Sequence, residues 1–300
     1  MEDNKILVSI RCLVYNHEPY LRQCLDGFVM QKTNFCFEAI VHDDASTDSS
    51  AAIIREYAEK YPHIIKPIYE TENQYSKRDG SLTRIMNAAC KGKYIAVCEG
   101  DDYWIDPLKL QKQVDFLETH LDYSMCFHRA KIENKINKSD VFIHCSTVED
   151  RDYTGEELFK KWIVPTASMM YRRELLDYKN ITDKRILYGD IILILRCAEF
   201  GKIKGMSSEM SVYRIQQNSA TNNPTLNKNR IEATPSFLDF IRENFSCVKN
   251  ETLRKLYSDS YFEIFKLNKN CNALWKSVKK SPLNVICRIF NWAIRSKLRK

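Results

Sequence analysis

Short apolar runs alternate with amphipathic stretches over the first 120 residues of the chain. The apolar runs have the length and composition of buried strands, and they are Leu7–Leu13, Phe37–His42, Ile64–Tyr69 and Tyr94–Cys98. Apolar residues at helical spacing follow each run: Leu21, Cys24, Leu25 and Phe28; Ile53, Ile54, Tyr57, Ala58 and Tyr61; Leu82, Ile85, Met86 and Ala89; Leu110, Val114, Leu117 and Leu121. This alternation predicts an α/β fold with a mainly parallel sheet flanked by helices.

Beyond residue 122 the pattern is less regular. The segments with strand character are Met125–Ala130, Val141–Cys145, Met169–Arg172 and Ile203–Ile215. A capping box at Thr154–Glu157 predicts a short helix, and Gly189-Asp190 precedes a second helix that ends near Phe200.

The composition changes again near residue 218. Residues 218–229 are rich in Asn and Thr, which predicts a polar loop, and the remaining residues read as helical. We therefore expect a first domain over residues 1–217, a loop over 218–229 and a helical extension over 230–300.

The cysteines indicate a reducing compartment. The chain has 11 cysteines, an odd number, and they are scattered without a C-x-x-C pair. This usage argues against a disulfide framework or a zinc ribbon and for the cytosol. We read no signal peptide and no apolar stretch long enough to cross a bilayer, so we expect a cytoplasmic protein.

Positive charge is concentrated at the carboxyl end of the chain. The net charge is +7, yet ten Lys or Arg residues follow Glu263 with no acid among them, so the remainder is slightly acidic. This distribution argues against nucleic acid as a partner. One apolar stripe runs through the tail and includes Leu283, Ile286, Phe290, Ala293 and Ile294. It predicts a basic amphipathic helix at the anionic inner face of the plasma membrane. The alternative is a terminal helix docked on the protein.

Polar residues follow three of the predicted strands. Right-handed crossovers bring the carboxyl ends of parallel strands to one edge of the sheet, where ligands usually bind. The residues expected at that edge are Asn16, Asp43, Asp44, Glu99, Asp101 and Asp102. Closely spaced carboxylates suit Mg²⁺ or Mn²⁺, which commonly bridge them to substrate phosphates. The alternative is a solvated acidic turn whose Asp106-Pro107 opens the next helix.

The order and spacing of these motifs resemble glycosyltransferase family 2. The motifs are Val8-Ser9-Ile10 through Tyr15-Asn16, Val41-His42-Asp43-Asp44-Ala45-Ser46-Thr47-Asp48, Gly92-Lys93-Tyr94-Ile95-Ala96 and Glu99-Gly100-Asp101-Asp102. The resemblance covers about residues 5–217. It implies a Rossmann-like GT-A fold and an inverting enzyme that uses a nucleotide sugar. It also places the chain near a bacterial branch that builds surface polysaccharides.

The resemblance implies a donor site. Asp43 and Asp44 match the acidic pair that binds the base and ribose, although Asp44 or Ser46 could instead cap the next helix. Asn87 lies near a position that faces the donor, and surface placement is equally open for it. Glu99 stands first in the family's Asp-x-Asp, where its longer side chain could reach the ribose or a water. Arg214 matches a diphosphate partner, against a plain ion pair.

The same resemblance implies a metal site. Asp101 is the expected ligand of Mn²⁺ or Mg²⁺, and Asp102 either coordinates the metal too or orients Asp101. Gln216 replaces a histidine that is usual in the family, which leaves a third protein ligand open. Trp104 is read either as a wall of the sugar or acceptor site or as a core or rim aromatic.

Asp190 matches the family's general base, which takes a proton from the acceptor hydroxyl as inversion proceeds. The alternative is a helix N-terminal acid stabilised by the helix dipole. The expected activity is transfer of a hexose, from a UDP-sugar, to a glycan or a lipid-linked acceptor. A catalytically inactive nucleotide-binding module is the alternative. A nucleotidyltransferase is less favoured, because a Gly-rich N-terminal loop is missing from the sequence.

Overall fold

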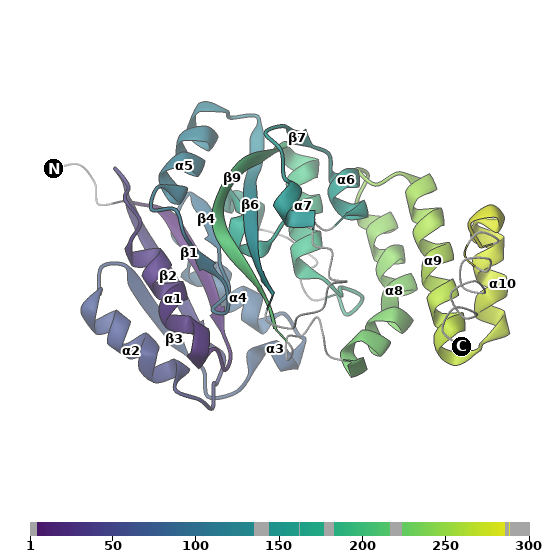
Figure 1. The fold of residues 1–300 in the computed structure, drawn as a ribbon, viewed down its shortest axis with the longest axis horizontal. Helices are drawn as coiled ribbons and strands as arrows, with labels where there is room; N and C mark the ends of the chain where they lie inside the picture. Colours follow the sequence, from purple (N-terminus) through teal and green to yellow (C-terminus); the bar gives the residue numbers. More distant parts are fainter. Residues whose placement is uncertain are drawn as a thin grey trace. The chain divides into compact units, whose positions relative to one another are not determined.

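The structure is a computed structural model that describes residues 5–134, 144–161, 163–176, 183–216 and 224–285, together with Arg288. The chain forms two compact units (Figure 1). The first comprises residues 1–184 and 196–216, and the second comprises residues 185–195 and 217–300. The second unit thus includes a segment that lies inside the predicted first domain, 1–217.

One mixed sheet forms the centre of the first unit. Its described strands are β1 (Ile6–Val14), β2 (Cys36–Asp43), β3 (Ile65–Tyr69), β4 (Tyr94–Val97), β5 (Tyr103–Trp104), β6 (Tyr123–Asn134), β7 (Asp152–Tyr153), β8 (Met170–Arg172) and β9 (Lys202–Ile215). Their order is β3-β2-β1-β4-β8-β6-β9-β5, and β7 pairs with β9.

The four strands predicted from the first apolar runs form one continuous parallel block of the sheet. Strand β1 lies parallel to both β2 and β4, and β2 lies parallel to β3. Strand β8 is antiparallel to β4 and β6, whereas the long strands β6 and β9 run parallel, side by side in Figure 1. The predicted α/β fold is confirmed, and its antiparallel pairs lie in the half of the sheet beyond β4.

Helices cover the sheet where the amphipathic stretches predict them. The described helices that lie wholly in the first unit are α1 (Glu18–Val29), α2 (Ser50–Lys60), α3 (Gln74–Lys77), α4 (Ser81–Ala89), α5 (Lys109–Thr119) and α6 (Gly155–Lys160). The apolar face of α1 is fully buried, as are Ile54 of α2 and Met86 of α4. The capping box at Thr154 is present and opens α6. In the part of the chain that the structure describes, the 3₁₀ turns are η1 (His144–Thr147), η2 (Thr166–Ser168) and η3 (Arg173–Leu176).

Close packing explains the glycine of the Gly92-Lys93 pair before β4. A Cβ atom on Gly92 would lie 2.4 Å from the backbone nitrogen of Ser9, so a larger residue would push β1 and β4 apart. The Gly92 amide instead donates to Ser9 Oγ, which itself donates to the buried carboxylate of Glu38. The motif therefore fixes how the two central strands meet.

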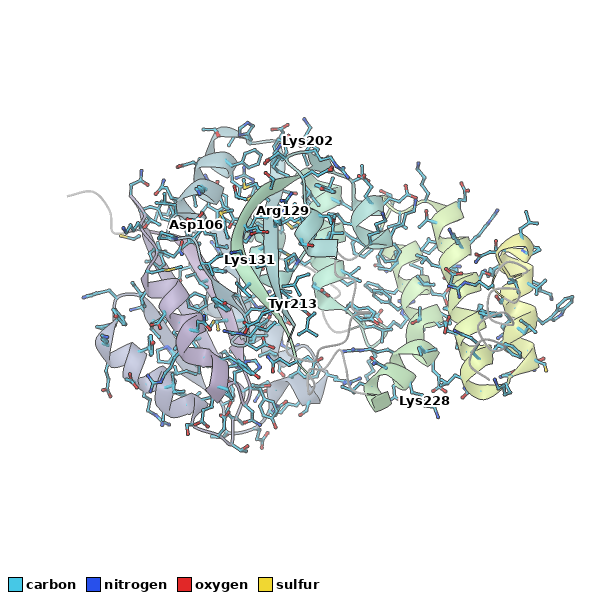
Figure 2. All side chains as sticks on the ribbon, viewed as in Figure 1. Asp106, Arg129, Lys131, Lys202, Tyr213 and Lys228 are labelled. Carbon is cyan, nitrogen blue, oxygen red and sulfur yellow. The ribbon has the colours of Figure 1, made fainter. Side chains whose placement is uncertain are left out.

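Three predicted boundaries are wrong. Asp106 does not open α5: it sits in a preceding turn (labelled in Figure 2), where its Oδ1 accepts the Leu108 amide, and the helix starts at Lys109. Leu121 is 75% exposed because α5 ends at Thr119. The predicted strand Val141–Cys145 falls partly outside the described residues, and its last two residues belong to η1.

A buried polar chain lies beneath the β4–α5 segment. The ammonium of Lys109 is fully buried, donates to Gln113 Oε1 at 2.7 Å and sits 4.0 Å from the centroid of the Trp104 ring. Gln113 donates onward to the carbonyl of Ser168, and Trp104 Nε1 donates to that of Ala167. Trp104 is therefore a core residue, which decides against the predicted wall of the sugar site.

Stability should rise with pH above neutrality because of Lys109. Burial lowers the pKa of this ammonium to about 7 from 10.5, so the unfolded chain binds more protons than the folded one between these values. The free energy of unfolding should increase on the order of 1 kcal/mol per pH unit above pH 7. We expect denaturant titrations at pH 7 and 8.5 to show this rise in the wild type, and Lys109→Met to remove it. An equal rise in the variant would contradict the assignment.

The second unit is helical. Its described elements are the first turns of α7 (Gly189–Phe200), then α8 (Pro224–Asn244), α9 (Asn250–Asn268) and α10 (Cys271–Lys280). Helix α8 starts inside the predicted polar loop of residues 218–229. Tyr257 of α9 donates to Asp239 of α8 at 2.6 Å, and Ser277 of α10 donates to the Ser258 carbonyl at 2.7 Å.

The described start of the basic tail packs on α9. Val285 is buried, Asn284 donates to Asp259, and Arg288 pairs with Asp259 and Glu263. The predicted apolar stripe beyond this point, including Phe290 and Ile294, lies outside the described residues. None of the helices in the described residues combines the length and apolar character needed to span a bilayer.

Candidate active site at the carboxyl edge of the sheet

The polar residues predicted at one edge of the sheet in the first unit do meet there. Register pairs Val14 of β1 with Asp43 of β2, and the Asp44 amide donates to the Val14 carbonyl at 2.9 Å. The Gly100 amide, just past β4, donates to the carbonyl of Leu13 at 3.0 Å. Backbone hydrogen bonds therefore place Asn16, the Asp43–Asp44 pair and the Glu99–Asp102 loop around the end of β1.

Reciprocal hydrogen bonds join the loops after β1 and β2. Asn16 Oδ1 accepts the Thr47 amide, while Ser46 Oγ accepts the Asn16 amide. Asp48 accepts the Glu18 amide, and Glu18 in turn accepts the Ser49 amide. The Asn16 side chain thus holds the two loops together. Asn16 could contact a nucleotide-sugar donor only through polar atoms that are not engaged in these hydrogen bonds.

The two aspartates after β2 have different surroundings. The carboxylate of Asp44 is buried and accepts the amides of Gln74 at 2.6 Å and Tyr75 at 3.0 Å, so it fixes α3 rather than capping the next helix. Asp43 is also buried, but its Oδ1 accepts no hydrogen bond from any described residue. Of the pair, Asp43 is the one with an oxygen left to accept a hydrogen bond.

A glycine lets the acidic loop pass beneath His17. A Cβ atom on Gly100 would lie 2.7 Å from His17 Nδ1 and 3.0 Å from the side chain of Val14, so a larger residue would displace the loop. Burial lowers the pKa of His17, and the charges of Asp101 and Asp48 act in the opposite direction. The structure thus places His17 beside the acidic loop.

Asp101 and Asp102 occupy unequal positions in this loop. Asp101 is partly exposed, and its Oδ2 accepts a hydrogen bond from Gln216 Nε2 at 3.2 Å. Asp102 is 2% exposed, and its Oδ1 accepts the backbone amide of Arg214 at 2.8 Å. Burial, and after it the charge of Asp101, raises the pKa of Asp102 well above its usual range. Asp102 thus anchors the loop, which favours the orienting role among its two predicted roles.

Arg214 is not available as the predicted diphosphate partner. Its side chain is 2% exposed, and the guanidinium donates to the Asp101 carbonyl at 2.7 Å, to Glu133 at 3.1 Å and to Gln23. The rings of Tyr20 and Tyr103 lie 5.1 and 4.3 Å from it. The hydrogen bonds of the guanidinium therefore hold the acidic loop against α1, β6 and β9 (Tyr213 of β9 is labelled in Figure 2). We call this arrangement the clamp.

Replacing this clamp should destabilise the protein. Arg214→Met leaves the Asp101 carbonyl and the Gln23 amide oxygen without a donor, and it removes the ion pair with the partly exposed Glu133. We therefore expect the free energy of unfolding to fall by about 2–3 kcal/mol. Urea titration measures it. Arg22→Met is the matched control, because Arg22 forms a bidentate pair with Glu56 on the open surface and should matter little. An equal loss in the two variants would contradict the clamp.

The two remaining predicted residues are Asn87 and Asp190. Helix α4 runs back along the sheet, and Asn87 near its carboxyl end lines a pocket with Ile6 and Lys91, where β1 and β4 begin. This is the opposite edge of the sheet, so we omit Asn87 from the donor site; the helix phase was the missing information. Asp190 stands in the first turn of α7, in the second unit. Its catalytic role stays a prediction.

The carboxyl edge fits a divalent cation shared with a substrate. Within the described residues, no three His, Cys, Asp or Glu side chains converge as a self-sufficient metal site. Mg²⁺ and Mn²⁺ do not need one, since they bind through one or two carboxylates together with substrate phosphates. Asp101 presents a partly exposed carboxylate fixed by Gln216, and Asp102 stands behind it. The donor set therefore fits the predicted metal.

The chain resembles proteins of known family. A family model described as Glycosyl transferase family 2 matches residues 9–178. The uncharacterized protein Rv1520 of Mycobacterium tuberculosis is 38% identical over 207 residues, which are 69% of this chain and 58% of the mycobacterial protein. The chain thus spans less than two thirds of the length of that relative.

Two solved structures share the fold. Residues 1–349 of TarS from S. aureus, in complex with UDP-GlcNAc, match with a TM-score of 0.65 at 18% identity, over 93% of this chain and 83% of that one. The mannosyltransferase PcManGT from Pyrobaculum calidifontis, in complex with GDP-Man and Mn²⁺, matches with a TM-score of 0.56 at 15% identity, over 97% and 81%. At these identities the similarity establishes the fold.

Proposed function

Since the chain belongs to glycosyl transferase family 2 and has the predicted GT-A fold, we propose that it transfers a sugar from a nucleotide-sugar donor to a hydroxyl acceptor, with inversion. The observation that carries the proposal is the gathering of Asp43, Asp101 and Asp102 at the end of β1. Backbone hydrogen bonds from Asp44 and Gly100 to β1 hold them there. Proteins with this fold have been solved with UDP-GlcNAc and with GDP-Man, so a sugar nucleotide is the class of donor to test first.

We assign the nucleoside to the loops after β1 and β2. The unpartnered Oδ1 of Asp43 is suited to accept a hydrogen bond from a uracil N–H or a ribose hydroxyl. Asp44 supports this site from behind, because its carboxylate fixes the backbone of Gln74 and Tyr75. Glu99 stands next to the same end of β1 and remains our candidate for the ribose.

We assign the diphosphate to the acidic loop, where Asp101 would hold Mn²⁺ or Mg²⁺. A bound divalent cation offsets the negative charge that builds on the leaving nucleoside diphosphate. Gln216 keeps the Asp101 carboxylate in place by a hydrogen bond, and the Arg214 amide does so for Asp102. Gln216 thereby takes a positioning role at the place of the usual histidine.

Asp190 is our candidate for the general base. Inversion requires the acceptor hydroxyl to attack the anomeric carbon from the face opposite the leaving group, and a carboxylate can take its proton as the bond forms. We propose a glycan or a lipid-linked oligosaccharide as acceptor, with a role in bacterial surface polysaccharide synthesis at the cytoplasmic side of the membrane.

A donor screen tests the proposal. Thermal melting with a panel of UDP-, GDP- and dTDP-sugars should show one donor that stabilises the protein in Mn²⁺ and loses this effect in EDTA. Release of free nucleotide should then require Mn²⁺ and an acceptor, and NMR of the product should show an inverted anomeric carbon. Donor binding without turnover across a broad acceptor panel would favour the inactive nucleotide-binding module instead.

We also propose that the second unit contacts an anionic membrane through α10 and the turn after it. Trp275 is 61% exposed and Leu283 is 79% exposed, and Lys276, Lys279 and Lys280 border them. Exposed large apolar side chains among lysines suit the interface of a bilayer with acidic headgroups. This surface would bring the enzyme to a lipid-linked acceptor.

The membrane surface has its own test. Co-sedimentation with phosphatidylglycerol vesicles should fall at least about tenfold in Trp275→Ser/Leu283→Ser, because the variant removes both large apolar side chains from the proposed membrane surface. Leu121→Ser is the matched control, since Leu121 is equally exposed but belongs to the first unit. Equal binding of the wild type and the double variant would refute the surface.

A further inference from the structure

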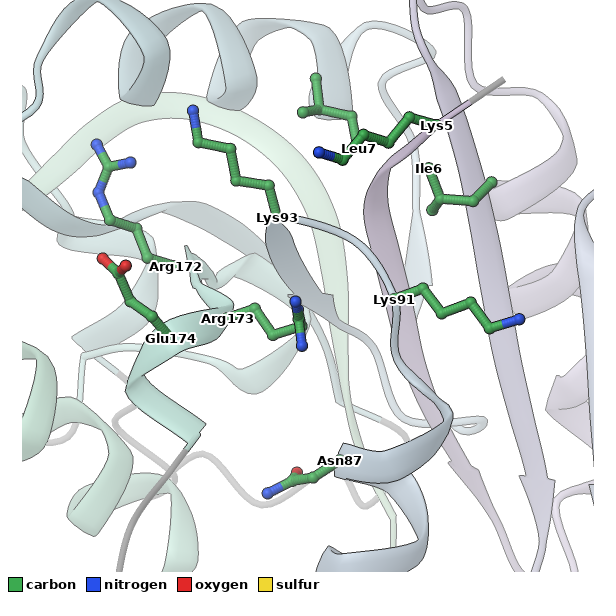
Figure 3. Close-up of a pocket in the computed structure, with 9 residues that line it drawn as sticks. All are labelled: Lys5, Ile6, Leu7, Asn87, Lys91, Lys93, Arg172, Arg173 and Glu174. Carbon is green, nitrogen blue, oxygen red and sulfur yellow. The ribbon is translucent and has the colours of Figure 1, made fainter. Parts of the chain in front are cut away.

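The first unit contains a pocket at the edge of the sheet opposite the acidic loop. The pocket measures about 510 Å³, and Figure 3 shows the residues that line it: Lys5, Ile6, Leu7, Asn87, Lys91, Lys93, Arg172, Arg173 and Glu174. They come from the start of β1, the end of α4, the turn before β4 and the end of β8. Strand β1 runs from Ile6 at this pocket to Val14 at the carboxyl edge, about 26 Å away at about 3.3 Å per residue. The pocket is therefore separate from the proposed donor site.

Five cationic side chains and one carboxylate line this pocket, and the cations divide into two groups. Lys93 pairs with Glu118, and Arg172 donates to the carbonyls of Leu117 and Tyr123, so both belong to the wall. Among the described residues no carboxylate pairs with Lys5, Lys91 or Arg173. Lys91 extends away from Arg173 in Figure 3, so Lys5 and Arg173 are the charges available to a ligand in this pocket.

Arg173 is held in place for such a role. Its Nε donates to the Gly92 carbonyl at 2.8 Å, which leaves the two terminal nitrogens of the guanidinium. Figure 3 shows Arg173 and Lys5 reaching into the pocket from opposite walls. A fixed guanidinium with two adjacent N–H groups matches two oxygens of a phosphate group, and an ammonium opposite it adds charge.

An amide at the same pocket adds a requirement on the ligand. Asn87 Oδ1 is buried and accepts no hydrogen bond from the described residues. An unsatisfied acceptor next to an anion site suits a ligand that carries a hydroxyl beside its phosphate. We propose that this pocket binds a phosphate ester that bears hydroxyl groups, either a soluble sugar phosphate or the headgroup of a glycerophospholipid.

Calorimetry of the full chain in EDTA tests the proposal, because EDTA removes metal-dependent binding at the carboxyl edge. The probes are glucose 6-phosphate and dihexanoyl-phosphatidylglycerol below its micelle concentration. The wild type should bind at least one of them, and Lys5→Gln/Arg173→Gln should weaken binding by about tenfold or more, as expected for the loss of charge-assisted hydrogen bonds. The probe that binds more tightly identifies the source of the phosphate.

Controls separate this pocket from the proposed active site. Lys255→Gln removes an exposed charge from α9 and should leave binding unchanged. Asp101→Ala should also leave it unchanged, so that failure of the transferase proposal would not affect the result. If the double variant melts early, Lys5→Gln alone still tests the proposal, since Lys5 is exposed. Absence of binding by the wild type, or equal affinity in wild type and charge variants, would overturn the proposal.

Discussion

Asp101→Ala should abolish metal-dependent transfer. Asp101 presents the partly exposed carboxylate of the acidic loop, and Asp102 behind it is anchored to the Arg214 amide, so the variant removes the main ligand of the proposed cation. A metal that offsets charge on a leaving group contributes several kcal/mol, and a loss of about 4 kcal/mol corresponds to a rate about 10³-fold lower. Steady-state release of nucleotide measures the fall. Stabilisation by Mn²⁺ plus donor in thermal melting should vanish with it.

Asp115→Ala is the matched control for this variant. Asp115 is an exposed carboxylate on α5 that accepts one hydrogen bond, from Gln111, and it lies outside the acidic loop. Its loss should leave turnover and the effect of Mn²⁺ unchanged. Full metal-dependent turnover in Asp101→Ala would show that the cation is bound by other residues.

Asp190→Asn should reduce turnover by about 10²–10⁴-fold, the usual contribution of a general base. The amide has nearly the same shape and can still accept a hydrogen bond, but it does not take a proton at neutral pH. Donor affinity should stay the same, because the nucleoside and diphosphate are assigned to the first unit.

The alternative for Asp190 predicts a different result. As a helix N-terminal acid it would contribute only about 0.3–1 kcal/mol through the helix dipole, and loss of turnover would then follow loss of stability. Urea titration beside the rate measurement distinguishes the two. Glu199→Gln, at the other end of α7, controls for a general effect of charge on this helix. Wild-type turnover in Asp190→Asn would end the base assignment.

The fold was predictable where hydrophobic spacing is regular. The four apolar runs form β1, β2, β3 and β4 in chain order. They were recognisable because a buried strand needs a continuous apolar segment and the intervening helices need an apolar face. Prediction failed where a local signal had two readings. Asp106-Pro107 has the composition of a helix start but forms the turn before it, and the Asn- and Thr-rich segment concealed the start of α8 at Pro224.

The candidate site was predictable only as far as residues at strand ends allow. Motifs place Asp43 and Asp101 at the carboxyl edge, since topology fixes which end of a parallel strand they follow. Arg214 was misassigned because its partners lie far away in the sequence: Gln23 is 191 residues distant, and Glu133 is 81. The placement of Asn87 depended on the phase of α4, which the local sequence pattern did not give.

The clamp on the acidic loop has a consequence for synthesis of the protein. The loop that carries Asp101 emerges from the ribosome more than 100 residues before Arg214, whose backbone and guanidinium fasten it. A nascent chain that has completed β1 to β4 therefore carries the acids without the strand that orders them. The acidic loop should therefore become able to bind a ligand late in translation, only after β9 has joined the sheet.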